Sequence, residues 1–228
     1  MRMLGLLRAV TVLSIVLLPV SAHAALIVPT SYDMLNGNLG TWDYFDGSYD
    51  GAGCVTCPNA SLTGGLSDLT DGVIAAGNWI TVEPAAGNGP YVGWRLLDPL
   101  ITFHFASGTT INGVTVYLDD SNGNGGVSPP SAIRINGQQF AVPDPAAGTP
   151  FPFTVVGLNV TGALQLELLR NGEWVFASEV QFDGTSPAAV PEPASLTLLA
   201  LGLAGMAARR RGMRDAGCGM RDCPEIRD

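Results

Sequence analysis

Lysine is absent from this chain of 228 residues, and histidine occurs only twice, at His23 and His104. Between residues 25 and 189 the basic side chains are three arginines against fifteen aspartates and glutamates, so this central segment carries a formal charge of about −12. Nucleic acids and anionic membranes bind proteins through a cationic surface, which the segment lacks. Both are therefore poor partners for it, whereas cations and neutral polymers are suitable ones.

Residues that commonly carry catalysis are also scarce. His104 is the one histidine of the central segment and lies in the alternating run Ile101-Thr102-Phe103-His104-Phe105, where it shares the polar face with Thr102. The pattern predicts a solvent-facing histidine on a strand, because no motif of a Ser-His-Asp triad or of a zinc site accompanies it. Paired carboxylates exist, but no spacing marks one as the acid and another as the nucleophile of a glycosidase. We therefore expect no catalytic residue.

Cysteine is limited to four residues, of which the central segment contains Cys54 and Cys57 in the run Gly-Cys-Val-Thr-Cys-Pro. In an oxidising compartment this spacing favours a small disulfide that closes a loop. The same C-x-x-C spacing occurs in redox-active pairs, but those begin a helix in a βαβ unit. Glycine-rich sequence surrounds the pair here, so we favour the structural disulfide.

The N-terminus has the three parts of a secretory signal peptide. A basic start at Arg2 precedes an almost unbroken apolar run over residues 4–20, and the small-x-small sequence Ala22-His23-Ala24 follows. The apolar run is short for a membrane-spanning helix, which needs about 20 residues. Cleavage after Ala24 and export are therefore expected, with an N-terminal membrane anchor as the alternative.

The C-terminus combines Pro191-Glu192-Pro193, an uncharged apolar segment over residues 194–208, and the basic cluster Arg209-Arg210-Arg211. An apolar segment with a cationic end is typical of a transmembrane helix whose arginines stay in the cytoplasm. This tail resembles the PEP-CTERM sorting signal. The resemblance implies that exosortase, a membrane transpeptidase, is a partner, and that the host is a Gram-negative bacterium which makes exopolysaccharide and biofilm matrix. It also implies an inner-membrane intermediate that ends at the cell surface or is secreted.

The body between these ends reads as all-β. Apolar residues alternate with period two in short runs, and turn residues separate the runs; Asn136-Gly137 and Asn171-Gly172 predict tight hairpins. No convincing helical periodicity occurs, so we expect a β-sandwich or jelly roll. The predicted strands cover residues 79–82, 100–105, 111–118, 132–136, 138–142, 151–155, 163–168 and 174–182. The expected organisation is a signal peptide (1–24), an aromatic, acidic and cysteine-containing part of the body (25–61), a β-sandwich core (62–185), a linker (186–193), a transmembrane sorting helix (194–208), and a basic stop with a cytoplasmic tail (209–228).

A second resemblance covers about residues 62–183. The early sequence Leu-Thr-Asp71-Gly72, Trp79, and the closing sequence Ser-Glu179-Val-Gln-Phe resemble the discoidin-like, galactose-binding-like jelly roll. The resemblance implies a structural calcium site where the Asp-Gly loop meets the last strand, with Asp71 and Glu179 as ligands and Asp68 nearby. Carboxylates in a glycine-rich loop suit calcium. The alternative is that Asp71 only shapes a turn and Glu179 faces water.

A separate acidic loop begins at Asp119. Asp120, Asn122 and Asn124, followed by Gly125, fit the start of a calcium-binding loop. The twelfth position is Ser131, where such loops carry a bidentate glutamate. We therefore favour an ordinary glycine- and asparagine-rich connection.

Aromatic side chains that project from loops at one end of a sandwich can stack on sugars. Trp42, Tyr44 and Trp94 are the candidates for carbohydrate binding, whereas buried aromatic residues would belong to the core. Together these features favour a non-catalytic module for adhesion or carbohydrate association at the cell surface or in the extracellular matrix. A polysaccharide-active enzyme, either a glycoside hydrolase or a lyase, and a purely structural surface protein are the alternatives.

Overall fold

The computed structural model describes residues 25–37, 44–83 and 89–187. The predicted signal peptide, Trp42, the sorting motif and the sorting helix lie outside these residues. Within them no helix is long and apolar enough to cross a bilayer.

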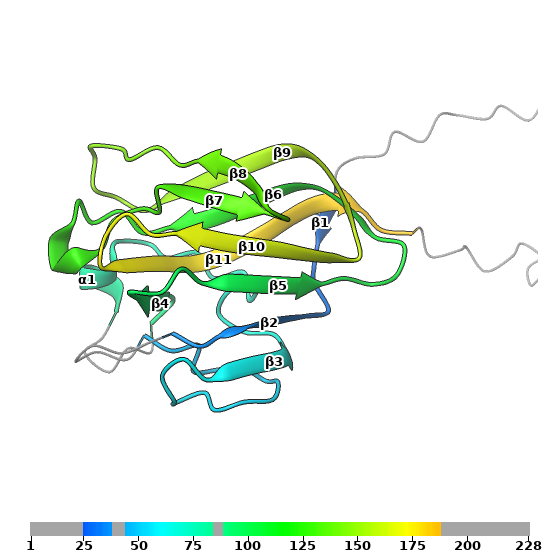
Figure 1. Ribbon diagram of the computed structural model, residues 1–228, viewed down its shortest axis with the longest axis horizontal. Coiled ribbons are helices and arrows are strands. Elements are labelled where there is room, and N and C mark those ends of the chain that lie inside the picture. The colour runs from blue at the N-terminus through cyan, green and yellow to red at the C-terminus, as the bar shows by residue number, and fades with distance from the viewer. Residues whose placement is uncertain (1–24, 38–43, 84–88, 188–228) are drawn as a thin grey trace, which may run out of the picture.

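The described residues form a β-sandwich of two antiparallel sheets (Figure 1). Sheet A contains β1 (Ala25–Ile27), β4 (Val92–Arg95), β6 (Thr110–Leu118), β9 (Phe151–Thr161) and β11 (Trp174–Thr185). Its order is β1-β11-β6-β9, and β4 also pairs with β11. Sheet B contains β2 (Ser31–Leu35), β3 (Ser61–Gly65), β5 (Leu100–His104), β7 (Ala132–Ile135), β8 (Gln138–Ala141) and β10 (Ala163–Leu169), in the order β3-β2-β5-β10-β7-β8. The prediction of an all-β sandwich is confirmed.

The core lies between the two sheets and follows the period-two pattern of the sequence. On β10, Leu164, Leu166 and Leu168 are fully buried, and on β6 Val114 and Val116 meet them from the other sheet. Because successive side chains of a strand point to opposite faces, this alternation fixes which face of each sheet is covered.

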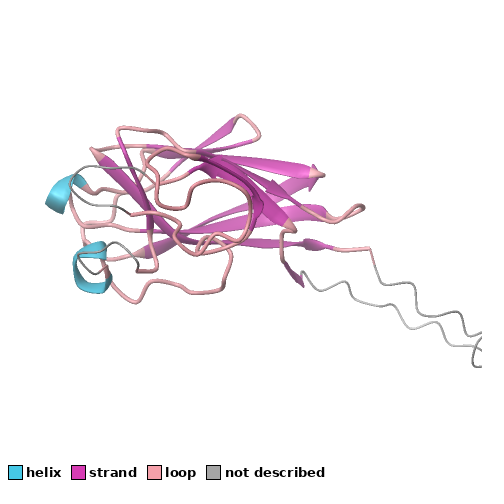
Figure 2. Cartoon of the chain, turned by 90° about the horizontal axis from the view of Figure 1, so that it is seen from below, coloured by secondary structure: helices cyan, strands magenta, loops and turns pink. Residues whose placement is uncertain are grey.

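The two ends of the body lie together. Ala25 of β1 pairs with Gly184 near the end of β11. The short helix α1 (Trp79–Val82) and the 3-10 turn η1 (Asn124–Gly126) lie at the opposite end of the sandwich (Figure 2). The segment that precedes the body and the segment that follows it therefore join it at one end.

One of the two predicted hairpins is confirmed. Asn136 and Gly137 have φ values of 48° and 84° and connect the paired strands β7 and β8, as a type I′ turn requires. The prediction of a hairpin at Asn171-Gly172 is wrong, because β10 and β11 belong to different sheets and neither residue has a positive φ. Arg170, which precedes Asn171, donates its Nε to Asp98 Oδ1 at 2.9 Å, so this connection is fixed to the loop before β5.

The predicted strand over residues 79–82 is also wrong, because these residues form α1. The backbone N–H of Glu83 donates to the carbonyl of Trp79 at 2.8 Å, and the N–H of Trp79 donates to Asp119 Oδ1 at 3.3 Å. The Trp79 ring stacks on Phe176, with 6.1 Å between ring centroids. Contacts with the ends of distant strands thus determine the conformation of this short apolar run.

The structure joins Cys54 and Cys57 in a disulfide. The bridge lies in the loop between β2 and β3 and not at the start of a helix. Asn36 at the end of β2 donates its Nδ2 to the carbonyl of Val55 at 3.0 Å. The disulfide loop is therefore attached to the sandwich, which fits a structural role.

Candidate functional site

The long strand β11 has a divided edge. On the side away from β6, β4 pairs with residues 174–177 and β1 pairs with residues 182–184. The loop over residues 69–72 occupies the gap between them, where the N–H of Val180 donates to the carbonyl of Leu69 at 2.8 Å. The loop thereby replaces a strand over the middle of this edge.

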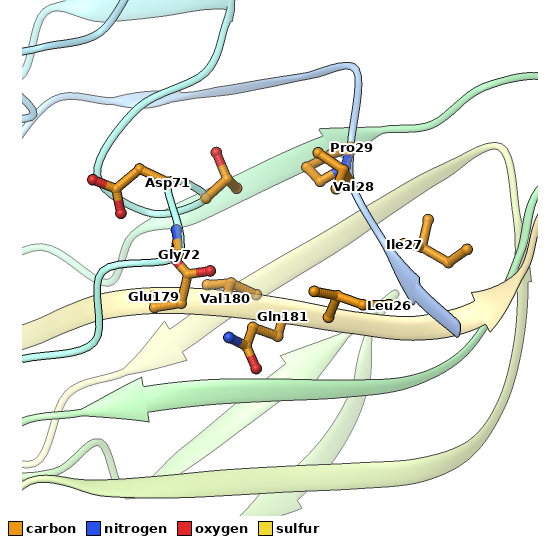
Figure 3. Close-up of a pocket in the computed structure, with 10 residues that line it drawn as sticks. Leu26, Ile27, Val28, Pro29, Asp71, Gly72, Glu179, Val180 and Gln181 are labelled. Carbon is orange, nitrogen blue, oxygen red and sulfur yellow. Dashed lines mark hydrogen bonds between the residues drawn. The ribbon is translucent and has the colours of Figure 1, made fainter. Parts of the chain in front are cut away.

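The same gap brings Glu179 to the Asp-Gly turn. The pairing of β11 with β6 shifts register between Ala177 and Glu179, which marks a β-bulge at Ser178. The Gly72 N–H donates to Glu179 Oε2 at 3.1 Å. Gly72 has φ of +83°, a conformation that other residues adopt only with strain. The bulge and the glycine together position the carboxylate under the loop (Figure 3).

Burial controls the charge of Glu179, whose residue is only 3% exposed. Burial raises the pKa of Glu179 to about 7, the negative charge of Asp71 adds to the rise, and the Gly72 hydrogen bond partly opposes it. A cation in the adjacent cavity would favour the ionised form, because an opposite charge nearby lowers the pKa of a carboxyl group.

Asp71 and Glu179 line one cavity of about 200 Å³. The remaining wall comes largely from apolar side chains of β1 and the residues after it, including Leu26 and Val28 (Figure 3). Asp71 Oδ1 accepts the Val73 N–H at 2.7 Å, so Asp71 also shapes its own turn. The turn and the cavity are compatible uses of this carboxylate, since a carboxylate has two oxygens.

Asp68 does not belong to this cavity. Its Oδ1 accepts the hydroxyl groups of Ser48 at 2.5 Å and of Ser67 at 3.1 Å. Within the described ranges no group of three or more histidine, cysteine, aspartate or glutamate side chains could share a metal ion. An ion held by Asp71 and Glu179 would therefore need carbonyl or water oxygens for its other ligands.

The prediction that Tyr44 and Trp94 bind sugars is wrong, because both side chains are buried. Trp94 is 0% exposed and Tyr44 is 4% exposed. The Tyr44 ring contacts Trp174 and Phe176 edge-on, with centroid distances of 5.4 Å and 4.8 Å. Both rings are used by the core, so neither can stack on a sugar.

His104 is half-exposed on β5, as expected for a strand histidine, but it has a partner that the sequence did not reveal. Its Nε2 lies 2.7 Å from Asp33 Oδ2 on the adjacent strand β2. The Thr30 hydroxyl donates to the backbone carbonyl of His104 at 3.1 Å, but in the part of the chain that the structure describes no hydroxyl or thiol side chain is hydrogen-bonded to its imidazole ring. The pair therefore lacks the nucleophile of a hydrolase triad.

The outer face of sheet A presents a group of polar side chains that the sequence reading also missed. Gln181, Thr115 and Thr154 stand opposite one another on β11, β6 and β9. The two threonine hydroxyls are 2.9 Å apart, and the Tyr117 hydroxyl donates to Gln181 Oε1 at 3.1 Å. We call these four residues the hydroxyl–amide row. Only the register of three strands assembles it, so single runs of sequence do not show it.

Comparison with known proteins identifies the tail. Residues 189–211 match the family described as PEP-CTERM protein-sorting motif. The chain is thus an exported protein with a sorting motif of the kind that exosortase processes. No curated protein matches the sequence.

Three solved structures have weak likenesses to the body. The family 32 CBM of C. perfringens NanJ in complex with galactose has 9% identity, covers 45% of this chain and 89% of its own, and gives a TM-score of 0.29. The CBM32 of AlyQ in complex with 4,5-unsaturated mannuronic acid has 18% identity, with 48% and 95% covered and a TM-score of 0.28. Truncated AlyQ with CBM32 and alginate lyase domains has 19% identity, 54% and 36% covered, and a TM-score of 0.29. Because these TM-scores are low, we describe the fold and the site from the contacts above and draw no argument from these likenesses.

Proposed function

We propose that the mature chain is a non-catalytic module that exosortase sorting delivers to the cell surface or the extracellular matrix, where it associates with polysaccharide. The sorting motif at residues 189–211 is the observation that carries this proposal. The pairing of Ala25 with Gly184 supports it, because the described body then ends at the same end of the sandwich at which it begins, opposite α1 and η1 (Figure 2).

The hydroxyl–amide row is the surface that we assign to the polysaccharide. It offers hydroxyl and amide groups on a broad sheet face, and these can both donate to and accept from the hydroxyls of a neutral polymer. Each such hydrogen bond contributes about 1 kcal/mol. The strong negative charge of the body makes a neutral polymer a better partner than an anionic one.

Binding without cleavage is the expected behaviour of the exported protein on insoluble cellulose and starch. Gln181→Ala should weaken co-sedimentation about fivefold, the effect of losing roughly 1 kcal/mol. Gln138→Ala, which changes an exposed glutamine on sheet B, is the matched control and should bind as the wild type does. Equal binding by both variants would remove the row from the proposal.

A polysaccharide-active enzyme is the second candidate. The shared cavity of Asp71 and Glu179, with the raised pKa of Glu179, favours it, because glycosidases use a protonated carboxyl group beside an ionised one. New reducing ends or unsaturated sugars in the same incubations, lost in Glu179→Gln, would support the enzyme. Intact polymer supports the binding module.

Calcium is the structural cofactor that we propose for Asp71 and Glu179. Carboxylate oxygens from a loop and a buried strand suit this ion. At a hundredfold excess over its dissociation constant, calcium should stabilise the fold by about 2.7 kcal/mol, which corresponds to several degrees in Tm. Asp71→Asn and Glu179→Gln should each remove this contribution to the Tm, so that calcium raises the Tm of either variant by less than it raises that of the wild type.

Magnesium and sodium at matched ionic strength are the controls for charge screening. If calcium raised the Tm of the wild type and of both variants equally, the site would not be at these residues.

A further inference from the structure

A second pair of carboxylates is buried at the end of the sandwich that carries α1 and η1 (Figure 2). Asp119 and Asp120 follow β6 directly and are 1% and 0% exposed. Removing an ionised carboxylate from water costs several kcal/mol unless hydrogen bonds or an opposite charge compensate. The partners of these four oxygens therefore decide what the pair can do.

Three of the four oxygens have donors. Asp119 Oδ2 accepts the Ser121 hydroxyl at 2.8 Å, and Asp119 Oδ1 accepts two longer bonds of 3.3 Å from the Trp79 N–H and the Tyr91 hydroxyl. Asp120 Oδ1 accepts the Asn122 N–H at 3.0 Å. Asp120 Oδ2 is buried and has no partner. One fully buried carboxylate oxygen thus remains uncompensated.

Basic side chains of the body are paired elsewhere. Arg95, Arg134 and Arg170 form ion pairs with Glu173, Glu167 and Asp98 respectively. The chain contains no lysine. Within the described ranges, the arginine ion pairs therefore involve carboxylates other than Asp119 and Asp120.

We infer that Asp119 and Asp120 bind a divalent cation of the calcium type at this end of the sandwich, separate from the cavity of Asp71 and Glu179. Asp120 Oδ2 and an oxygen of Asp119 supply the negative charge. Side-chain and backbone oxygens of the loop over residues 121–126, together with water, supply the remaining ligands. Calcium fits better than magnesium, because an asparagine- and glycine-rich loop offers irregular oxygen ligands and magnesium requires a near-ideal octahedron.

An ion bound by Asp119 and Asp120 would also stabilise the segments that are hydrogen-bonded to them. Asn78, which precedes α1, donates its Nδ2 to the carbonyl of Asp120 at 2.9 Å and to the carbonyl of Gly148 at 2.7 Å. Trp79 of α1 is hydrogen-bonded to Asp119. An ion on the carboxylates would therefore order three segments at the end of the sandwich opposite its joined ends.

Terbium luminescence tests the site on the full exported chain. Terbium replaces calcium at oxygen sites, and a nearby tryptophan sensitises its emission. Here the backbone N–H of Trp79 donates to Asp119, and the Trp79 ring lies against Gly125 of the same loop. Titrations in the Glu179→Gln background isolate this site from the other cavity. We expect saturable emission that calcium displaces, and at least a tenfold loss of affinity in Asp120→Asn. Asp144→Asn removes one exposed charge from another loop and should bind as the background does.

These measurements distinguish the absence of an ion at Asp119 and Asp120 from the absence of an ion at Asp71 and Glu179. Loss of binding in Glu179→Gln alone would place the only ion at Asp71 and Glu179 and overturn the inference. Equal affinities of Asp120→Asn and Asp144→Asn would overturn it as well. If Asp120→Asn does not fold, amide exchange of the wild type decides: calcium should protect residues 119–126, and unchanged exchange there contradicts the site.

Discussion

Replacing Trp94 with alanine should destabilise the body by about 3–5 kcal/mol, the usual cost of truncating a large buried ring. Trp94 is fully buried on β4 of sheet A, and its indole N–H donates to the Leu35 carbonyl of β2 in sheet B at 2.9 Å. The truncation would both open a cavity and leave that carbonyl unpaired between the sheets. Since whole domains are stable by only about 5–15 kcal/mol, much of the variant should be unfolded at moderate temperature.

Chemical denaturation followed by tryptophan fluorescence measures this effect. Trp94→Phe keeps most of the ring and loses the hydrogen bond, so its free energy of unfolding should lie between those of the wild type and the alanine variant. Val156→Ala, at a side chain that is 75% exposed on β9, should differ little from the wild type. A wild-type transition midpoint for Trp94→Ala would mean that this ring is not a core residue.

The strands that the sequence predicted well share one property. β6 and β10 bury alternate residues against the other sheet, as at Val114 and Val116 or Leu164 and Leu166. Period-two hydrophobicity reports this arrangement directly. The hairpin at Asn136-Gly137 was predictable for a similar local reason, because its turn needs residues that tolerate positive φ.

The strands before residue 96 were not predictable in this way. β2 alternates in burial, with Tyr32 and Met34 inward, but it has only five residues, and the neighbouring β3 ends in two glycines. β4 does not alternate, because three successive residues are buried and Gly93 lies directly against the Phe176 ring. Partners far along the chain define these strands. The segment over residues 25–61 consequently contributes β1 to sheet A and β2 to sheet B.

The candidate sites also differ in whether local sequence or distant packing defines them. Asp71 and Glu179 were found through a family pattern, and the structure brings them to one cavity. The burial of Tyr44 and Trp94, the Asp33–His104 pair and the hydroxyl–amide row depend on the packing and register of distant strands. The sequence alone therefore did not predict these contacts, because they join strands that are far apart along the chain.

Sorting should depend almost completely on Glu192. The match at residues 189–211 includes this residue between Pro191 and Pro193, before the apolar segment and the arginine cluster. Recognition of such a short motif uses few contacts, so loss of its one acidic side chain should prevent processing. Glu225→Ala changes a glutamate beyond the motif and is the matched control.

The most direct measurement is the mass and cell fraction of the chain in a host with exosortase. We expect the wild type and Glu225→Ala to lose the tail and reach the surface or the medium, and Glu192→Ala to remain at full precursor length in the membrane. The same host without exosortase should retain all three. Processing and release of Glu192→Ala at the wild-type level would contradict the assignment of this protein as an exosortase-sorted surface module.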